Sequence, residues 1–329
     1  MFVTGAYESG KSQMLNMLAE KLAKNEQRLV LNLDAKKFSN EAEFVQSMLT
    51  ELTTGFVNLR QNMPYNLLKE INTKFPSLNK SVKLPFGIDQ MLGTCYLKLE
   101  NGIKEILDKN GKISTSGVHD FLNTMQLFYQ TLNPVIFIHG GDKLIGCDLW
   151  EIVKAALSRK NLYNDFIPIV IELDDSSVLN DYELLSSINN IRVVSSEDFN
   201  ETACEILIRS RIFSSPELRK INNKFGLHGG SLSHIFENLK FGMSIDDAIQ
   251  KEKKYIEDNL NKNLQLNKKS HFIAKFCKSN GIAFADNIMD INNLKPLFEK
   301  GYVYTDSGFQ TRVANKVVLK RSEERRVGK

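Results

Sequence analysis

Cysteine is scarce in this sequence, and long apolar runs are absent. Four cysteines are spread over 329 residues, and no two of them have the C-x-x-C spacing that is typical of zinc and redox sites. This pattern gives no metal site and fits reduced thiols in an intracellular protein. Apolar runs such as Ile167 to Ile171 are far shorter than the ~20 residues that cross a bilayer. Because residues 1–30 also show no secretory signal, we expect an intracellular, cytoplasmic location and no membrane partner.

The sequence also lacks a large excess of either charge, because it has 43 basic and 39 acidic residues. The apolar share of 42% and the charged share of 25% exclude a disordered or fibrous chain. The length predicts one large domain with a smaller one, or two domains. Residues 240–320 hold 14 basic and 9 acidic side chains. This local surplus allows weak DNA binding, although a solvated lysine-rich surface is the favoured explanation.

Short β-branched runs alternate with helical patterns over residues 1–195. The runs are Met1–Thr4, Arg28–Leu33, Pro134–Ile138, Phe166–Ile171 and Ile191–Val194. Strands that alternate with helices predict an α/β fold with a parallel sheet covered on both faces. Residues 55–133 show no convincing strand and predict a helical insertion. The first run is shorter than most strands, so we expect an N-terminal truncation, with the strand starting upstream of Met1.

The pattern changes to helices alone after residue 195. Ser195, three residues before Asp198, predicts a helix start, and Ser215-Pro216 predicts another. We interpret residues 196–258 as a helical segment. In residues 259–320, predicted helices precede a hairpin with Gly308 at its turn, which favours a small winged-helix-like module. Residues 321–329 lack periodicity and are interpreted as a non-native tail.

The sharpest motif is Gly5-x4-Gly10-Lys11-Ser12 between the first strand and a helix predicted to end near Lys24. In a phosphate-binding loop of this spacing, glycines let backbone N–H groups surround phosphate oxygens, the lysine reaches the β- and γ-phosphates, and the serine hydroxyl binds Mg²⁺. The alternative is a glycine-rich turn with an exposed lysine. The residues expected to bind ATP are Gly5, Ala6, Tyr7, Glu8, Ser9, Gly10, Lys11, Ser12 and Gln13, with Ser12 on Mg²⁺.

An acidic pair is missing where a P-loop ATPase uses one. One carboxylate normally holds Mg²⁺ through water and another orients the attacking water. The best candidate strand, Pro134–Ile138, continues into His139 and Gly140 instead. We therefore expect weak or absent hydrolysis, and we expect acids restored at these two positions to raise turnover.

Together, these features resemble the archaeal-type ATPase family among the AAA-like and STAND-like P-loop NTPases. The resemblance rests on Gly5–Ser12, Pro134–Leu144, Ile167–Ser177, Phe225–Gly230 and Leu294–Val313. It implies a parallel sheet with strand order 5-1-4-3-2, a helical lid over about residues 196–258, a winged-helix-like ending and a nucleotide-driven switch.

The implied strand order suggests two substitutes for the missing acids. Glu172 would point from the tip of the fourth strand towards the γ-phosphate, and Asp142 could fold inward on the flexible Gly140-Gly141 loop. The alternative for Glu172 is that it caps or solvates the following helix. His139 either touches phosphate or is an ordinary histidine at a strand end.

These observations favour an ATP-dependent switch that hydrolyses slowly or not at all. One alternative is a degenerate ATPase that serves as a protein-interaction or DNA-binding module. A second is a small-molecule P-loop kinase, which the lack of an arginine-rich lid disfavours. A GTPase is disfavoured because the sequence has no Asn-Lys-x-Asp motif. A protein partner and a homo-oligomer both stay open.

Overall fold

The computed structural model describes twelve stretches of the chain. They are residues 1–5, 9–62, 90–145, 147–150, 153–154, 167–176, 179, 192–196, 201–263, 282–283, 303–305 and 311–313. Two compact units make up the structure, one consisting mainly of Ser12–Glu172 and the other mainly of Arg192–Lys329. Among the described helices, none combines the length and the apolar character that a membrane crossing needs.

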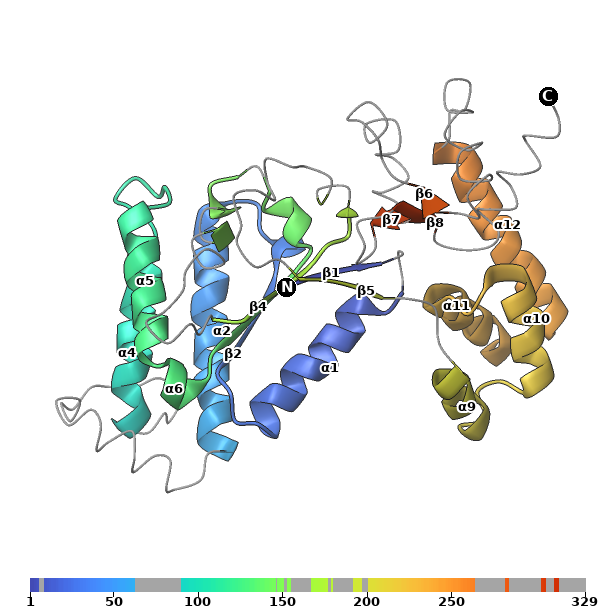
Figure 1. The fold of residues 1–329 in the computed structure, drawn as a ribbon, viewed down its shortest axis with the longest axis horizontal. Coiled ribbons are helices and arrows are strands. Elements are labelled where there is room, and N and C mark those ends of the chain that lie inside the picture. The colour runs from blue at the N-terminus through green and yellow to red at the C-terminus, as the bar shows by residue number, and fades with distance from the viewer. Residues whose placement is uncertain are drawn as a thin grey trace. The chain divides into compact units, whose positions relative to one another are not determined.

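A five-stranded parallel sheet has the order β2-β3-β4-β1-β5. Figure 1 labels β1, β2, β4 and β5 of this sheet. Its strands are β1 (Phe2–Gly5), β2 (Val30–Asp34), β3 (Val135–His139), β4 (Ile169–Glu172) and β5 (Val193–Ser196). The predicted order 5-1-4-3-2 is therefore confirmed. Every residue of β1, β3 and β4 is buried, as expected for inner strands with both faces covered. Burying one large aliphatic side chain in such strands stabilises the fold by about 1.5–3 kcal/mol.

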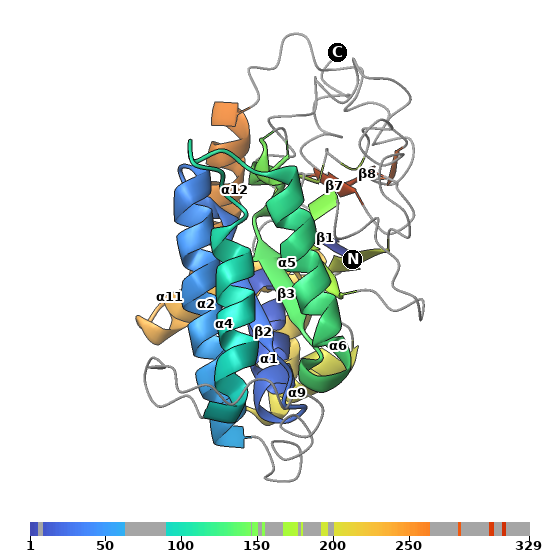
Figure 2. The same cartoon turned by 90° about the vertical axis from the view of Figure 1, so that its left-hand side faces the viewer.

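The described residues between β2 and β3 are mainly helical. They form the 3₁₀ turn η1 (Ala35–Lys37) and the helices α2 (Glu41–Asn62), α4 (Gln90–Lys104), α5 (Thr115–Leu127) and α6 (Tyr129–Leu132). Helix α4 packs against both α2 and α5, and α2 also packs against β2 (Figure 2). Ser114 begins α5 as an N-cap, because its side chain accepts a hydrogen bond from the Gly117 N–H.

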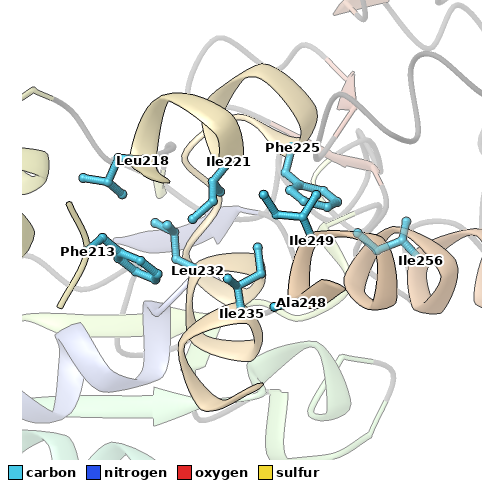
Figure 3. Packing of buried hydrophobic residues seen from close by; sticks show 9 residues of the cluster. All are labelled: Phe213, Leu218, Ile221, Phe225, Leu232, Ile235, Ala248, Ile249 and Ile256. Carbon is cyan, nitrogen blue, oxygen red and sulfur yellow. The ribbon is translucent and has the colours of Figure 1, made fainter. Parts of the chain in front are cut away.

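Four helices of the second unit follow β5. They are α9 (Glu201–Arg209), α10 (Ser215–Phe225), α11 (Gly229–Lys240) and α12 (Ile245–Asn263). Figure 3 shows the apolar side chains that pack together from α10, α11, α12 and Phe213. A capping box between Ser214 and Glu217 starts α10, with proline in its first turn. The predicted helix start at Ser195 is wrong: Ser195 lies inside β5, because tertiary pairing in a sheet overrides a weak local capping signal.

A separate three-stranded sheet has the order β6-β8-β7. Its strands are β6 (Ile282–Ala283), β7 (Val303–Thr305) and β8 (Thr311–Val313). Strands β7 and β8 pair antiparallel, with Tyr304 opposite Arg312, so the two arms of the predicted hairpin are paired. The helices predicted over 264–278 and 294–300, and the tail 321–329, lie outside the described residues. The winged-helix module therefore stays a prediction.

Candidate functional site

The loop between β1 and α1 (Lys11–Lys24) requires glycine at both ends. Gly5 has φ +141° and Gly10 has φ +85°, conformations that side chains with a Cβ rarely adopt. An added Cβ on Gly10 would meet nothing within 4 Å, so at this position the backbone conformation, and not crowding, selects glycine. Ala6, Tyr7 and Glu8 lie outside the described residues. The glycine spacing of the motif is thus matched by backbone geometry.

The predicted phosphate-binding side chains differ in exposure. Ser9 is buried, and Lys11 is only 5% exposed although it is a lysine. The Lys11 Nζ donates a hydrogen bond of 3.2 Å to the Gly5 carbonyl oxygen, which excludes the alternative of an exposed lysine on a glycine-rich turn. Gln13 is exposed. Ser12, the second residue of α1, is partly buried.

Three neighbouring strands bring polar residues to one edge of the sheet. Asp34 is paired in register with His139, and Ile138 is paired with Ile171. One residue further along, the same register places His139 beside Glu172. Parallel strands end at the same edge, and paired residues point to the same face. The last residues of β2, β3 and β4 therefore form one polar row.

Glu172 joins this row to the end of the loop. Its Oε1 accepts a hydrogen bond of 2.5 Å from the Ser12 hydroxyl, and its Oε2 lies 2.5 Å from His139 Nδ1. The side chain is 1% exposed. A buried carboxylate needs such partners, because burial without hydrogen bonds would cost several kcal/mol. The alternative that Glu172 is solvated at the start of the next helix is therefore excluded.

His139 is also bound on its other side, by a residue that the sequence analysis did not identify. Its Nε2 lies 2.9 Å from Asn32 Oδ1, and Asn32 Nδ2 donates to Asn16 Oδ1 at 2.9 Å. The available signal was that Asn32 is the one polar residue within the run Leu29–Leu33. A polar residue in a half-buried strand is informative because it needs a partner.

The Asn32 backbone has its own partner in α2. Strand β2 lies at the edge of the sheet, and the Asn32 N–H donates to Glu51 Oε2 at 3.2 Å. Burial raises the pKa of Glu51, while the Asn32 hydrogen bond and the charge of Lys37 act in the opposite direction. A carboxylate on an edge-strand N–H satisfies the donor and blocks further strand pairing there.

Asp142, the second predicted substitute acid, lies in the turn η4 (Gly141–Lys143) that follows β3. Its carboxylate is 3.7 Å from Lys143 Nζ, and its side chain is 4% exposed. The described contacts bring Glu172, and not Asp142, onto Ser12. The turn itself packs closely on β4, since a Cβ added to Gly141 would lie 2.1 Å from Ile171 Cγ2.

Among the described residues, no three His, Cys, Asp or Glu side chains gather in a way that could hold a metal ion by themselves. An oxygen-only pair of Ser12 and Glu172 suits Mg²⁺, which prefers oxygen ligands and keeps several waters or takes phosphate oxygens. The donor set therefore fits a magnesium ion that arrives with a nucleotide.

Comparison with known proteins supports the fold. No family model matches the chain, and no curated protein matches it. A solved Walker-type ATPase of Pyrococcus abyssi superimposes with a TM-score of 0.53 at 12% sequence identity, covering 98% of this chain and 90% of that one. At this identity the likeness shows the fold alone. The chain thus shares the fold of that protein, with a five-stranded parallel sheet and helices.

Proposed function

We propose that the chain binds Mg-ATP at the Gly5–Ser12 loop and acts as a nucleotide-dependent switch with slow or absent hydrolysis. The observation that carries this proposal is the hydrogen bond from Ser12 to Glu172. In P-loop NTPases the serine of this motif binds Mg²⁺ and a strand-end carboxylate supports the metal. Here that carboxylate comes from β4, because the end of β3 holds His139 in place of an acid.

The loop residues fit a triphosphate. Gly10 leaves room for phosphate oxygens, and Lys11 brings a positive charge to the start of α1. The N-terminus of a helix adds free N–H groups and a favourable dipole for anions. Mg²⁺ would neutralise charge on the phosphate oxygens, and Ser12 with Glu172 would hold it.

Slow hydrolysis follows from how Glu172 is used. Both of its oxygens already have hydrogen-bond partners, Ser12 on one side and His139 on the other. A carboxylate that orients water must offer an oxygen to that water. Because Glu172 is held by Ser12 and His139, and β3 ends in a histidine in place of a second acid, binding should persist while turnover stays well below the ~1 s⁻¹ lower end of ordinary enzymes.

The test measures affinity and turnover on one purified sample. A fluorescent ATP analogue is titrated with Mg²⁺ and with EDTA, and phosphate release is followed with ATP. We expect binding that Mg²⁺ strengthens, and turnover well below ~1 s⁻¹. Glu172→Gln should reduce the strengthening by Mg²⁺ and abolish residual turnover, whereas Asp142→Asn should change both less.

A matched control is Glu20→Gln, which removes an exposed carboxylate from α1 and should leave affinity and turnover unchanged. Two results would contradict the proposal. One is a lack of nucleotide binding by the wild type. The other is rapid hydrolysis that survives both Glu172→Gln and Asp142→Asn.

A further inference from the structure

A continuous line of side-chain hydrogen bonds runs from Ser12 across three strands. It passes from Ser12 to Glu172 on β4, His139 on β3, Asn32 on β2 and then Asn16 on α1. The successive heavy-atom distances are 2.5, 2.5, 2.9 and 2.9 Å. The line therefore connects the proposed magnesium ligand to the edge strand of the sheet.

The direction of these bonds determines how the histidine ring is used. Asn32 Nδ2 donates to Asn16, which leaves Asn32 Oδ1 as the acceptor that faces His139. Nε2 of His139 therefore carries a hydrogen. Nδ1, on the other side of the ring, lies 2.5 Å from Glu172 Oε2. Both ring nitrogens are engaged, so the ring can neither rotate nor flip without breaking a buried hydrogen bond.

This anchoring matters because a glutamate side chain is flexible. Glu172 has three rotatable side-chain bonds. The one hydrogen bond from Ser12 to Oε1 does not by itself determine where Oε2 lies. His139 holds that oxygen in a setting where His139 is 7% and Glu172 1% exposed. Losing the histidine would remove the hydrogen-bond partner of a buried carboxylate oxygen, and the side chain would turn towards another partner.

We propose that His139 and Asn32 are positioning residues that hold the Glu172 carboxylate on the Ser12 hydroxyl, and that the magnesium affinity of the site depends on them. This inference rests on the proposed function. Partners that orient a metal-site ligand typically contribute about 10- to 100-fold to metal affinity. His139 stands at the end of β3, where the sequence motif leads one to expect an acid. In this proposal it instead supports Glu172, the acid on the neighbouring strand β4.

The experiment separates the metal from the nucleotide. A fluorescent ATP analogue is titrated in EDTA and in Mg²⁺, and the ratio of the two affinities gives the gain due to Mg²⁺. Binding of Mn²⁺ in the presence of the analogue is followed independently by electron paramagnetic resonance. His139→Phe should reduce the magnesium gain and the Mn²⁺ affinity about 10-fold or more, with the affinity in EDTA changed less than about threefold.

A conservative variant and a second position keep the test decisive. His139→Gln should restore much of the gain, because its amide N–H can donate to Glu172. Asn32→Leu should lose part of the gain, and Asn32→Asp should retain it, because a carboxylate still accepts from Nε2. These two variants carry the test if His139→Phe does not fold, as judged by thermal unfolding. His119→Phe, at an exposed position of α5, is the matched control and should change nothing.

The outcomes distinguish the two proposals. If the wild type binds nucleotide and gains affinity with Mg²⁺, but folded His139→Phe or Asn32→Leu gains as much, the positioning role is overturned and the proposed function stands. If the wild type binds no nucleotide in either condition, both are overturned. A loss in His139→Phe that His139→Gln repairs supports the positioning role, because a general folding defect would also lower the affinity in EDTA.

Discussion

The Glu172 carboxylate and the Ser12 hydroxyl meet at 2.5 Å although 160 positions separate them in the sequence. The contact joins the end of β4 to the first turn of α1. An acid one strand away from its expected position thereby reaches the serine of the Gly5–Ser12 motif. The missing acids on β3 thus do not leave Ser12 without a carboxylate.

Removing the Lys11 side chain is expected to weaken ATP binding about tenfold or more. The Lys11 ammonium is buried and held near the Gly5 carbonyl, and Lys11→Ala would delete a charge-assisted contact to phosphate. Titration with a fluorescent ATP analogue measures the change. Lys24→Ala, at the exposed far end of the same helix, should bind as the wild type does. Equal affinities for Lys11→Ala and wild type would show that the loop does not bind phosphate.

Adding a methyl group at Gly141 should destabilise the fold by about 1–3 kcal/mol, the usual effect of overpacking. The added Cβ would lie 2.1 Å from Ile171 Cγ2, so β4 or the turn must shift. Denaturant unfolding of Gly141→Ala measures this. In an Ile171→Leu background, which lacks that methyl group, the same change should cost less. An identical cost in both backgrounds would rule out this contact as the cause.

Replacing Glu51 by glutamine should stabilise the protein above neutral pH. Burial raises the pKa of Glu51 in the folded state, so the folded protein holds this proton to higher pH than the unfolded chain does. Stability that depends on Glu51 is therefore present at low pH and falls as pH rises through the folded-state pKa. Glutamine keeps an acceptor for the Asn32 N–H and has no charge to bury.

The measurement compares the free energy of unfolding of Glu51→Gln and wild type at about pH 4 and about pH 8, on either side of the titration of a raised carboxyl pKa. Glu51→Gln should have the larger free energy of unfolding at the higher pH, and the difference from wild type should be smaller at the lower pH. A variant that is less stable than the wild type at the higher pH would contradict the raised pKa.

The helical core shown in Figure 3 should depend strongly on Ile221. Ile221 is fully buried, and Ile221→Ala should cost about 2–5 kcal/mol through lost burial and an internal cavity. Ile206 is 59% exposed on α9, so Ile206→Ala should stay within about 0.5 kcal/mol of wild type. Urea unfolding followed by circular dichroism compares the two. Similar costs for both would mean that this cluster does not stabilise the unit.

The structure gives two reasons against the expectation that acids at His139 and Gly140 would raise turnover. Gly140 has φ +62°, and a Cβ there would lie 2.7 Å from Lys36 Cγ. A glutamate at this position would be strained. An aspartate in place of His139 would remove the partner of Glu172 and set two carboxylates beside each other. Like charges at such a distance repel and would disturb the existing site.

Local signals in the sequence indicated the approximate positions of the five strands, the end of α1 and the glycine positions of the loop. Helix α1 ends at Lys24 as predicted, because its periodicity and starting motif lie within one segment. The glycine positions Gly5 and Gly10 could be predicted for the same reason, because a positive φ is a property of a single residue. The proposed phosphate-binding loop was inferred from eight consecutive positions alone. The strand order was an expectation from resemblance, and the sheet confirms it.

Only the tertiary structure decided which polar residues act together. The sequence offered Glu172 and Asp142 as equal candidates and left His139 open, and Asn32 was not identified at all. Their roles depend on strand order, register and the face to which each side chain points, and a shift of one residue would reverse that face. Contacts between β4, β3, β2 and α1 span up to 160 positions, and local propensity carries no information over such separations.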